Sequence, residues 1–234
     1  MIPLAILAGG LGTRLHPITL TQPKSLVRVL NVPFIELQLK LLSKSGFERV
    51  VLCLGHKHEE IIRYLGDGNR FEMEIEYSIE PTMLGTGGAL FHARNKLGPN
   101  FGVLYGDSYL PINYRTITEY FFKQNTIALM TLYKRKSFSD ECNVKFVNQK
   151  VMLYSKREKK TEMLHVDYGF SILNSKVFNY FPNAENAESV DLADIFERIS
   201  KEGQVSGFEV AERFYEVGSH EGIRELEKFL KEND

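Results

Sequence analysis

The sequence LAILAGGLGTRL, residues 4–15, decides how this chain folds. Residues 4–7 form a short apolar run that stops at Gly9 and Gly10, as a buried parallel strand does where it enters a turn. Glycines after a strand let backbone N–H groups approach a phosphate without interference from a Cβ atom. Arg14 adds a planar guanidinium that suits phosphate oxygens, and Lys24 adds a mobile positive charge. The stretch therefore predicts a phosphate-binding loop at the end of the first strand.

Two well-known glycine-rich motifs do not match this loop. A P-loop requires G-x-x-x-x-G-K-[ST], and no lysine follows a glycine in that register here. The dinucleotide fingerprint requires G-x-G-x-x-G, but Gly10 and Gly12 are followed by Leu15 where a Gly or Ala should stand. The loop thus excludes a P-loop ATPase and disfavours a Rossmann dehydrogenase.

The first half of the chain alternates predicted strands and helices. This alternation predicts βαβ units and a parallel sheet with right-handed crossovers. In such sheets ligands bind beyond the carboxyl ends of the strands, where both the glycine loop and Asp107 fall. The predicted strands are 4–7, 49–54, 71–77 and 101–105, and the predicted helices are 33–45, 56–65 and 85–96.

The pattern changes after Phe121. No repeat, low-complexity tract or linker interrupts the chain, so one mixed α/β domain over residues 1–234 is expected. In this half the predicted strands are 126–132, 144–147, 150–154, 168–173 and 214–217, and the predicted helices are 175–181, 191–201 and 219–230.

Composition excludes several classes of partner. The formal net charge of -1 gives no reason to expect nucleic acid or an anionic membrane surface. No apolar run is long enough to span a bilayer, and the N-terminus lacks the basic region of a signal peptide. Cys53 and Cys142 lie far apart without metal-ligand spacing, and Cys53 is expected in the core. We therefore expect a cytoplasmic protein.

The segment 7–36 resembles the signature of the sugar-phosphate nucleotidyltransferase family, which carries G-G-x-G-T-R-L, then P-K, then a further proline. LGTGGAL at 84–90, YGDS at 105–108 and YEVGSHEG at 215–222 agree with that family in order and spacing. The resemblance implies a Rossmann-like, mixed, mainly parallel sheet flanked by helices, with a small sugar-binding lobe from the second half. It assigns residues 1–110 mainly to the nucleotide and residues 111–234 mainly to the sugar phosphate.

The resemblance also implies an activity, which is conversion of an NTP and a sugar 1-phosphate to an NDP-sugar and pyrophosphate with Mg²⁺ as cofactor. Arg14, Lys24 and Asp107 inherit catalytic roles. The residues that inherit nucleotide binding are Leu7, Ala8, Gly9, Gly10, Gly12, Thr13, Arg14, Glu80, Gly85 and Thr86.

The second half departs from the family pattern at two implied positions. Asp107 is implied as a metal ligand together with Glu216, which stands where the family usually has Asp and still offers a hard oxygen that Mg²⁺ accepts. Lys156, Asp167 and Gly169 are implied at the sugar phosphate, with Asp167 in place of the commoner Asn. These departures leave open a non-catalytic, nucleotide-sensing relative.

The chain's compact length resembles heptose 1-phosphate guanylyltransferases and N-acetylmuramate 1-phosphate uridylyltransferases. We favour GTP with a heptose- or mannose-like 1-phosphate, as a precursor of cell-surface polysaccharide. Transfer of a uridylyl or cytidylyl group to another phosphorylated substrate remains the alternative. The 16 Phe and 11 Tyr residues could also supply a homo-oligomer interface.

Overall fold

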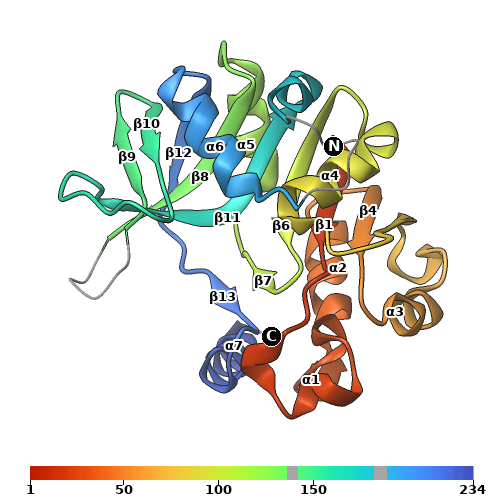
Figure 1. The fold of residues 1–234 in the computed structure, drawn as a ribbon. Helices are drawn as coiled ribbons and strands as arrows, with labels where there is room; N and C mark the ends of the chain where they lie inside the picture. Colours follow the sequence, from red (N-terminus) through yellow and green to blue (C-terminus); the bar gives the residue numbers. More distant parts are fainter. Residues whose placement is uncertain (136–141, 182–188, 234) are drawn as a thin grey trace.

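A computed structural model describes residues 1–135, 142–181 and 189–233. Its centre is a nine-stranded mixed sheet in the order β5-β4-β1-β6-β11-β8-β12-β10-β9, with helices on both faces (Figure 1). Sequence periodicity explains this layering, because alternate residues of β1 (Leu4–Leu7) face opposite cores. Leu4 and Ile6 join one apolar cluster, whereas Ala5 joins the other.

Four parallel strands form the N-terminal part of the sheet. They are β1, β4 (Arg49–Leu54), β5 (Glu74–Ile79) and β6 (Asn100–Tyr105). The predictions for β1, β4 and β6 are confirmed. The strand predicted at 71–77 begins later, because Asn69–Phe71 form the short 3₁₀-helix η3 and Glu72 has a positive φ of 57°.

The helices divide between the two faces of the sheet. One face is covered by α2 (Phe34–Lys44), α3 (His58–Leu65) and α5 (Tyr114–Phe122). The opposite face is covered by α4 (Gly85–Leu97), η4 (Ser175–Tyr180) and α6 (Leu192–Lys201).

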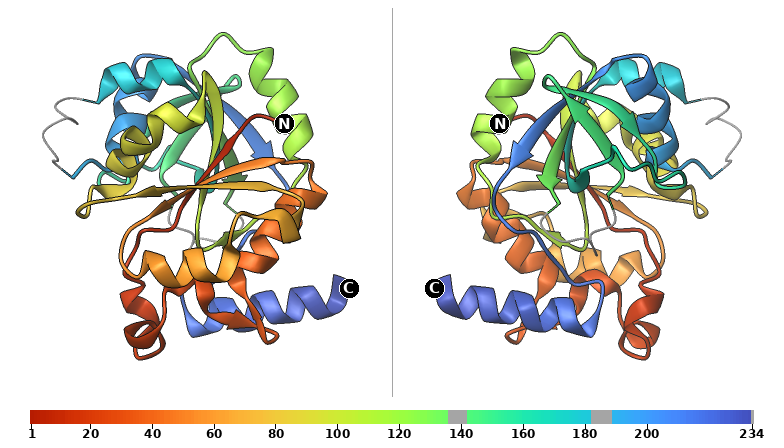
Figure 2. Two further views of the ribbon diagram at one scale, coloured as in Figure 1. Left: turned by 90° about the vertical axis from the view of Figure 1, so that its right-hand side faces the viewer. Right: turned by 90° about the vertical axis from the view of Figure 1, so that its left-hand side faces the viewer.

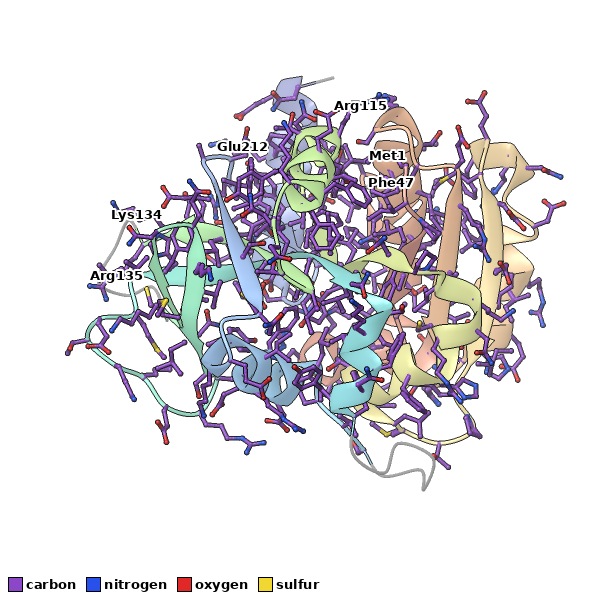
Figure 3. The ribbon with its side chains drawn as sticks, turned by 90° about the horizontal axis from the view of Figure 1, so that it is seen from above. Met1, Phe47, Arg115, Lys134, Arg135 and Glu212 are labelled. Carbon is purple, nitrogen blue, oxygen red and sulfur yellow. The ribbon has the colours of Figure 1, made fainter. Side chains whose placement is uncertain are left out.

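Aromatic rings tie α5 to the sheet. Phe47, labelled in Figure 3, packs edge-on against Tyr114 with 5.4 Å between ring centroids. Tyr114 packs in turn against Phe170, at 4.9 Å. No helix was predicted here, because the segment is rich in Thr, Tyr and Phe, which favour strands. The side chain of Asn113 accepts a hydrogen bond from Thr116 N at 3.1 Å and caps the helix.

The second half continues the same sheet. Its strands are β8 (Ala128–Lys134), β9 (Val144–Val147), β10 (Lys150–Tyr154), β11 (His165–Asn174) and β12 (Val205–Val210). β11 runs antiparallel to β6 and β8, while β12 runs parallel to β8. β9 also pairs with β11 through Val144 and His165, which closes the five strands into a ring.

β12 was not predicted from the sequence, and a glycine explains why. Together with the polar Ser206 and Glu209, Gly207 breaks the apolar pattern that would mark a strand. A Cβ atom at this position would lie 2.4 Å from the ring of Phe146. The close packing of Phe146 against β12, inside the closed set of five strands, therefore favours glycine at this position. The helix predicted at 175–181 is the 3₁₀-helix η4.

A two-stranded sheet lies apart from the main one and joins distant parts of the chain. In it β7 (Ser108–Tyr109) pairs with β13 (Tyr215–Glu216). The C-terminal helix α7 (His220–Asn233) follows directly and lies below the main sheet in the side views (Figure 2). The short elements η1 (Thr13–Leu15), α1 (Ile18–Thr21), η2 (Lys24–Leu26), β2 (Arg28–Val29) and β3 (Val32–Pro33) complete the described chain. In the described residues, no helix is long and apolar enough to cross a bilayer.

Candidate active site

A cleft of about 340 Å³ opens at the carboxyl ends of β1 and β6. Every residue that the sequence predicted for the nucleotide lines it, and so do Lys24 and Asp107. Residues from separate segments of the chain thus meet at one edge of the sheet. The cleft is also lined by residues that were not predicted for the site, namely Ser25, Cys53, Met83, Ala89, Tyr105, Gly106 and Gly218.

The glycine-rich loop has a shape that other residues would not tolerate. Gly12 has a φ of +65°, in the left-handed region, and its carbonyl oxygen accepts a hydrogen bond from Thr19 Oγ1 at 2.8 Å. A Cβ atom on Gly9 would lie 2.5 Å from Glu80 Oε1. Ala8 N donates to the Cys53 carbonyl at 2.9 Å, which anchors the loop to β4. The backbone of the loop is therefore held open toward the cleft.

Glu80 follows β5 and places a carboxylate beside that loop. Its backbone N–H donates to the Leu54 carbonyl at 2.8 Å, and its Oε2 accepts from Leu84 N at 3.0 Å. Burial raises the pKa of Glu80, against the opposing effect of the Leu84 hydrogen bond.

Cys53 lies in the core as expected and also borders the cleft. Its side chain is fully buried, and burial raises the pKa of the thiol to about 12. The thiolate is therefore disfavoured, and Cys53 is not suited to act as a nucleophile.

Four charged side chains gather where β7 and β13 meet the glycine loop. Lys24 Nζ forms an ion pair with Asp107 Oδ2. Val217 N donates to the Asp107 carbonyl at 2.9 Å, which brings the neighbouring Glu216 to the same place. A Cβ atom on Gly218 would lie 3.1 Å from Arg14 Nη2 and 3.4 Å from Glu216 Oε2.

The pKa of Glu216 reflects this crowding of charges. Burial raises it first, and the negative charge of Asp107 raises it further. The positive charges of Arg14 and Lys24 act in the opposite direction. A cation near Asp107 and Glu216 would therefore reduce the electrostatic repulsion between these two carboxylates.

Asp107 and Glu216 fit a magnesium ion by their chemistry. Mg²⁺ is commonly bound through one or two carboxylates plus substrate phosphates, rather than by a cage of protein ligands. Over residues 1–135, 142–181 and 189–233 there is no cluster of three or more His, Cys, Asp or Glu side chains that could hold a metal alone. The ammonium of Lys24 already contacts one of the two carboxylates, which marks the position as favourable for positive charge.

Asp167 and Gly169 lie on β11 and do not line the cleft. Gly169 has a φ of +104°, and its N–H donates to Asp167 Oδ1 at 3.1 Å. Burial raises the pKa of Asp167, which the charge of Lys156 opposes. Tyr105 lines the cleft and lies close enough to this region to sense its charges. Burial raises the pKa of the Tyr105 hydroxyl, and the negative charges of Asp167, Asp191 and Asp107 raise it further.

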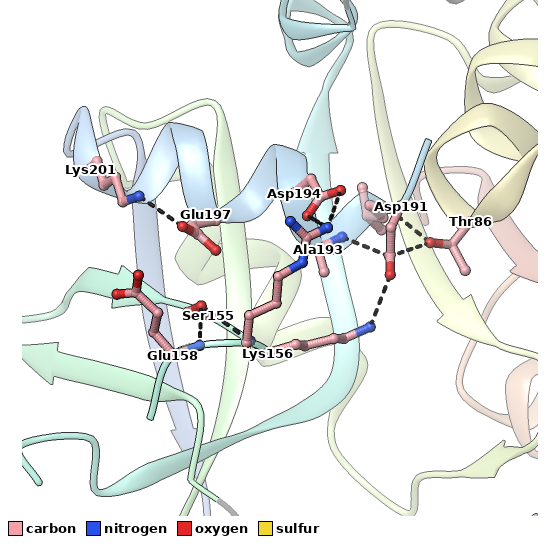
Figure 4. Close-up of polar contacts among 11 residues, drawn as sticks. Thr86, Ser155, Lys156, Glu158, Asp191, Ala193, Asp194, Glu197 and Lys201 are labelled. Carbon is pink, nitrogen blue, oxygen red and sulfur yellow. Dashed lines mark hydrogen bonds and ion pairs between the residues drawn. The ribbon is translucent and has the colours of Figure 1, made fainter. Parts of the chain in front are cut away.

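Lys156 follows β10 and reaches toward the first turn of α6 (Figure 4). Its Nζ lies 3.8 Å from Asp191 Oδ2, and its side chain is 46% exposed, so the ammonium is accessible to solvent. Lys156 does not line the cleft either.

Asp191 joins the two halves of the site and was not predicted as a site residue. Its Oδ1 accepts hydrogen bonds from Thr86 Oγ1 at 2.8 Å and from Ala193 N at 3.0 Å (Figure 4). Burial acts to raise the pKa of Asp191, but these hydrogen bonds and the charge of Lys156 outweigh it and lower the pKa. The sequence predicted only a helix over 191–201 here, because the contact with Thr86 spans 105 residues of sequence.

Comparisons with known proteins agree with this geometry. The model of the nucleotidyl transferase family matches residues 4–233. The chain is 28% identical over 228 residues to the D-glycero-alpha-D-manno-heptose 1-phosphate guanylyltransferase of Aneurinibacillus thermoaerophilus, with 97% of each chain covered. It is 30% identical over 217 residues to the UTP–glucose-1-phosphate uridylyltransferase of Synechocystis sp., covering 85% of this chain and 55% of that one.

The chain spans about half the length of several curated relatives that it matches. Among solved structures, HddC from Yersinia pseudotuberculosis superimposes with a TM-score of 0.81 at 23% identity, with 98% of this chain and 100% of that chain covered. At that identity the likeness establishes a common fold.

Proposed function

Because this chain belongs to the nucleotidyl transferase family, we propose that it converts an NTP and a sugar 1-phosphate to an NDP-sugar and pyrophosphate. The observation that carries the proposal is the meeting of Arg14 and Lys24 with the carboxylates of Asp107 and Glu216 beside the glycine loop. Cations suit the phosphates of a nucleotide, while paired carboxylates suit the metal ion that accompanies them.

The glycine loop would hold the triphosphate. The backbone of Gly9, Gly10 and Gly12 borders the cleft without side chains that would keep phosphate oxygens away. Arg14 follows immediately and carries a planar fork of donors. Asp107 and Glu216 would hold Mg²⁺, which when bound supplies positive charge beside the phosphates.

The reaction needs no general base. A phosphate oxygen of the sugar 1-phosphate forms a new bond to the α-phosphorus, and the bond from that phosphorus to the bridging oxygen breaks to release pyrophosphate. The attacking phosphate has a second pKa of about 6, so it is already mostly charged at neutral pH. The main barrier is repulsion between two polyanions, which Arg14, Lys24 and Lys156 would offset.

We propose GTP and a heptose- or mannose-like 1-phosphate as the substrates. The Glu80 carboxylate, when ionised, only accepts hydrogen bonds, and guanine offers adjacent N–H donors on its pairing edge. The name of the Aneurinibacillus relative supports the same choice. The Synechocystis relative is named for UTP, so a uridylyl group remains the alternative. Both substrates are small phosphorylated metabolites, and we expect the reaction in the cytoplasm.

The test is a panel of four NTPs against mannose, heptose, glucose and N-acetylglucosamine 1-phosphates in Mg²⁺. Pyrophosphate release and mass spectrometry of the nucleotide sugar report turnover. We expect GTP with a manno-configured sugar to give the highest kcat/KM. If no pair releases pyrophosphate while a nucleotide still binds, the chain is a nucleotide sensor and the proposal fails.

A further inference from the structure

The C-terminal helix α7 begins two residues after Gly218 and contributes no side chain to the chemistry proposed above. It packs against β13 and β2, beside the two-stranded sheet that carries Glu216 (Figures 1 and 2). That sheet has only two residues in each strand. Two paired strands are marginally stable at best by themselves. Contacts beyond this sheet and the Val217 N–Asp107 carbonyl hydrogen bond are therefore needed to fix Glu216 relative to Asp107.

One ring on α7 contacts both strands of this sheet. Phe229 stacks on Tyr215 of β13 with 4.5 Å between centroids and an interplanar angle of 27°. The same ring meets Tyr109 of β7 edge-on at 6.3 Å. Tyr215 pairs with Tyr109 across the sheet, and the next pair is Glu216 with Ser108. Phe229 thus contacts the pair that lies next to Glu216 and two residues along the chain from Asp107.

The first turn of α7 presses on the backbone of Glu216. A Cβ atom on Gly222 would lie 2.2 Å from the Glu216 carbonyl oxygen, well inside the 3.0 Å that real Cβ contacts keep. The obstructing atom belongs to the backbone, so it cannot turn aside as a flexible side chain would. Gly222 N also donates to Ser219 Oγ at 3.0 Å, which fixes the start of the helix.

The rest of α7 packs against β2, the turn after it and the start of α2. Leu226 is fully buried in a cluster with Val217, Val29 and Phe34. Glu227 Oε1 accepts a hydrogen bond from Leu30 N at 3.3 Å, in the turn between β2 and β3. The helix therefore cannot shift without disturbing several contacts at once.

We propose that α7 positions Glu216 against Asp107, with Gly222 and Phe229 as the positioning residues, and that it thereby sets the affinity of this site for a divalent cation. The inference rests on the proposed function, because it takes these two carboxylates as the metal ligands. It assigns a role to two residues that touch neither substrate nor metal.

The test measures binding of Mn²⁺ alone to the full chain by electron paramagnetic resonance. Gly222→Ala and Phe229→Leu are expected to weaken Mn²⁺ binding by about 10-fold, the usual loss when support of a metal ligand is removed. Phe229→Tyr keeps the ring and should restore affinity. Arg224→Ala, on an exposed position of the same helix, is the matched control and should bind as the wild type does. In the two weakened variants, kcat should fall while KM for the sugar 1-phosphate is unchanged.

Unchanged Mn²⁺ affinity in Phe229→Leu and in a folded Gly222→Ala would overturn the inference. If circular dichroism shows that Gly222→Ala does not fold, the Leu and Tyr variants at Phe229 decide alone. Failure of the proposed function has a different signature. In that case the wild type releases no pyrophosphate with any substrate pair, although Mn²⁺ affinity still falls in the variants.

Discussion

Lys24 and Asp107 form an ion pair across 83 residues of sequence, and both residues line the cleft beside the glycine loop. The pair places a protein cation on a carboxylate that we propose as a metal ligand. Lys24 and a divalent metal would therefore compete for the same oxygen atoms, and each of the two residues can be tested separately.

Asp107→Asn is expected to lower kcat by about 100-fold or more, because it removes one of the two carboxylates that would hold Mg²⁺. The steady-state rate of pyrophosphate release measures the loss. Asn keeps the size of the side chain, and an unchanged unfolding temperature would exclude a general folding defect. Near-normal turnover would show that Asp107 is not a metal ligand.

Lys24→Gln is expected to separate metal binding from catalysis. Without the ammonium, Asp107 is free for the metal, so Mn²⁺ should bind at least as tightly as in the wild type. Turnover should nevertheless fall by about 100-fold, because positive charge near the reacting phosphates is lost. Calorimetric titration with Mn²⁺ and the rate assay measure the two effects. A parallel decline in both would argue that Lys24 only supports the structure.

Lys156→Met is expected to raise KM for the sugar 1-phosphate by about 10-fold or more, since a hydrogen bond to a charged group contributes about 1.5–3 kcal/mol. KM for the NTP should not change, because Lys156 lies outside the nucleotide cleft. Lys160→Met is the matched control, a similarly exposed lysine of the same loop that pairs with Glu158. Equal effects of the two substitutions would contradict a specific role for Lys156.

Glu80→Gln is expected to lower kcat/KM for GTP by about 10-fold or more, while KM for the sugar 1-phosphate stays constant. In the variant, the NH₂ group of the introduced glutamine replaces one carboxylate oxygen and faces an N–H group of guanine. Both groups are hydrogen-bond donors, so that hydrogen bond is lost. The ratio of kcat/KM between GTP and UTP measures the change in base selectivity. A ratio that does not move would remove Glu80 from base recognition.

The raised pKa of Glu80 also predicts a pH dependence of stability. The folded chain keeps this proton to higher pH than the unfolded chain does, so ionisation of Glu80 lowers stability as pH rises through the folded pKa. Glu80→Gln should therefore raise the unfolding temperature at pH 8 relative to that of the wild type. The gain should shrink on acidification toward about pH 3, below the ordinary pKa of Glu, where the carboxyl is protonated in both states. A difference that stays constant from pH 3 to 8 is the outcome that contradicts this prediction.

Much of the nucleotide half could be predicted from the sequence because its signals are local. Short apolar runs that end near glycines identify β1, β4 and β6. The loop from Gly9 to Arg14 follows the carboxyl end of β1, as the sequence predicted. Every predicted nucleotide residue lines one cleft. The roles of these residues in binding remain predictions.

The second half was harder to predict because its determinants are contacts between distant segments. The shape of β12 depends on the ring of Phe146 against Gly207, and the role of Asp191 depends on Thr86. Neither partner lies near in the sequence. Lys156 and Asp167, implied only by resemblance, lie outside the cleft and near Asp191 and Tyr105. The homo-oligomer suggested by aromatic content also remains a prediction.

The closure of β9 onto β11 has a consequence for self-association. It shields one end of the main sheet and leaves β5 as the outermost strand at the other end. β5 carries Glu74 and Glu76, and Glu76 pairs with Arg49 and Lys96. Charged residues on an outer strand discourage a second copy from extending the sheet by backbone hydrogen bonds, which protects the chain from aggregation. Any assembly of this chain is therefore expected to form through helices or loops.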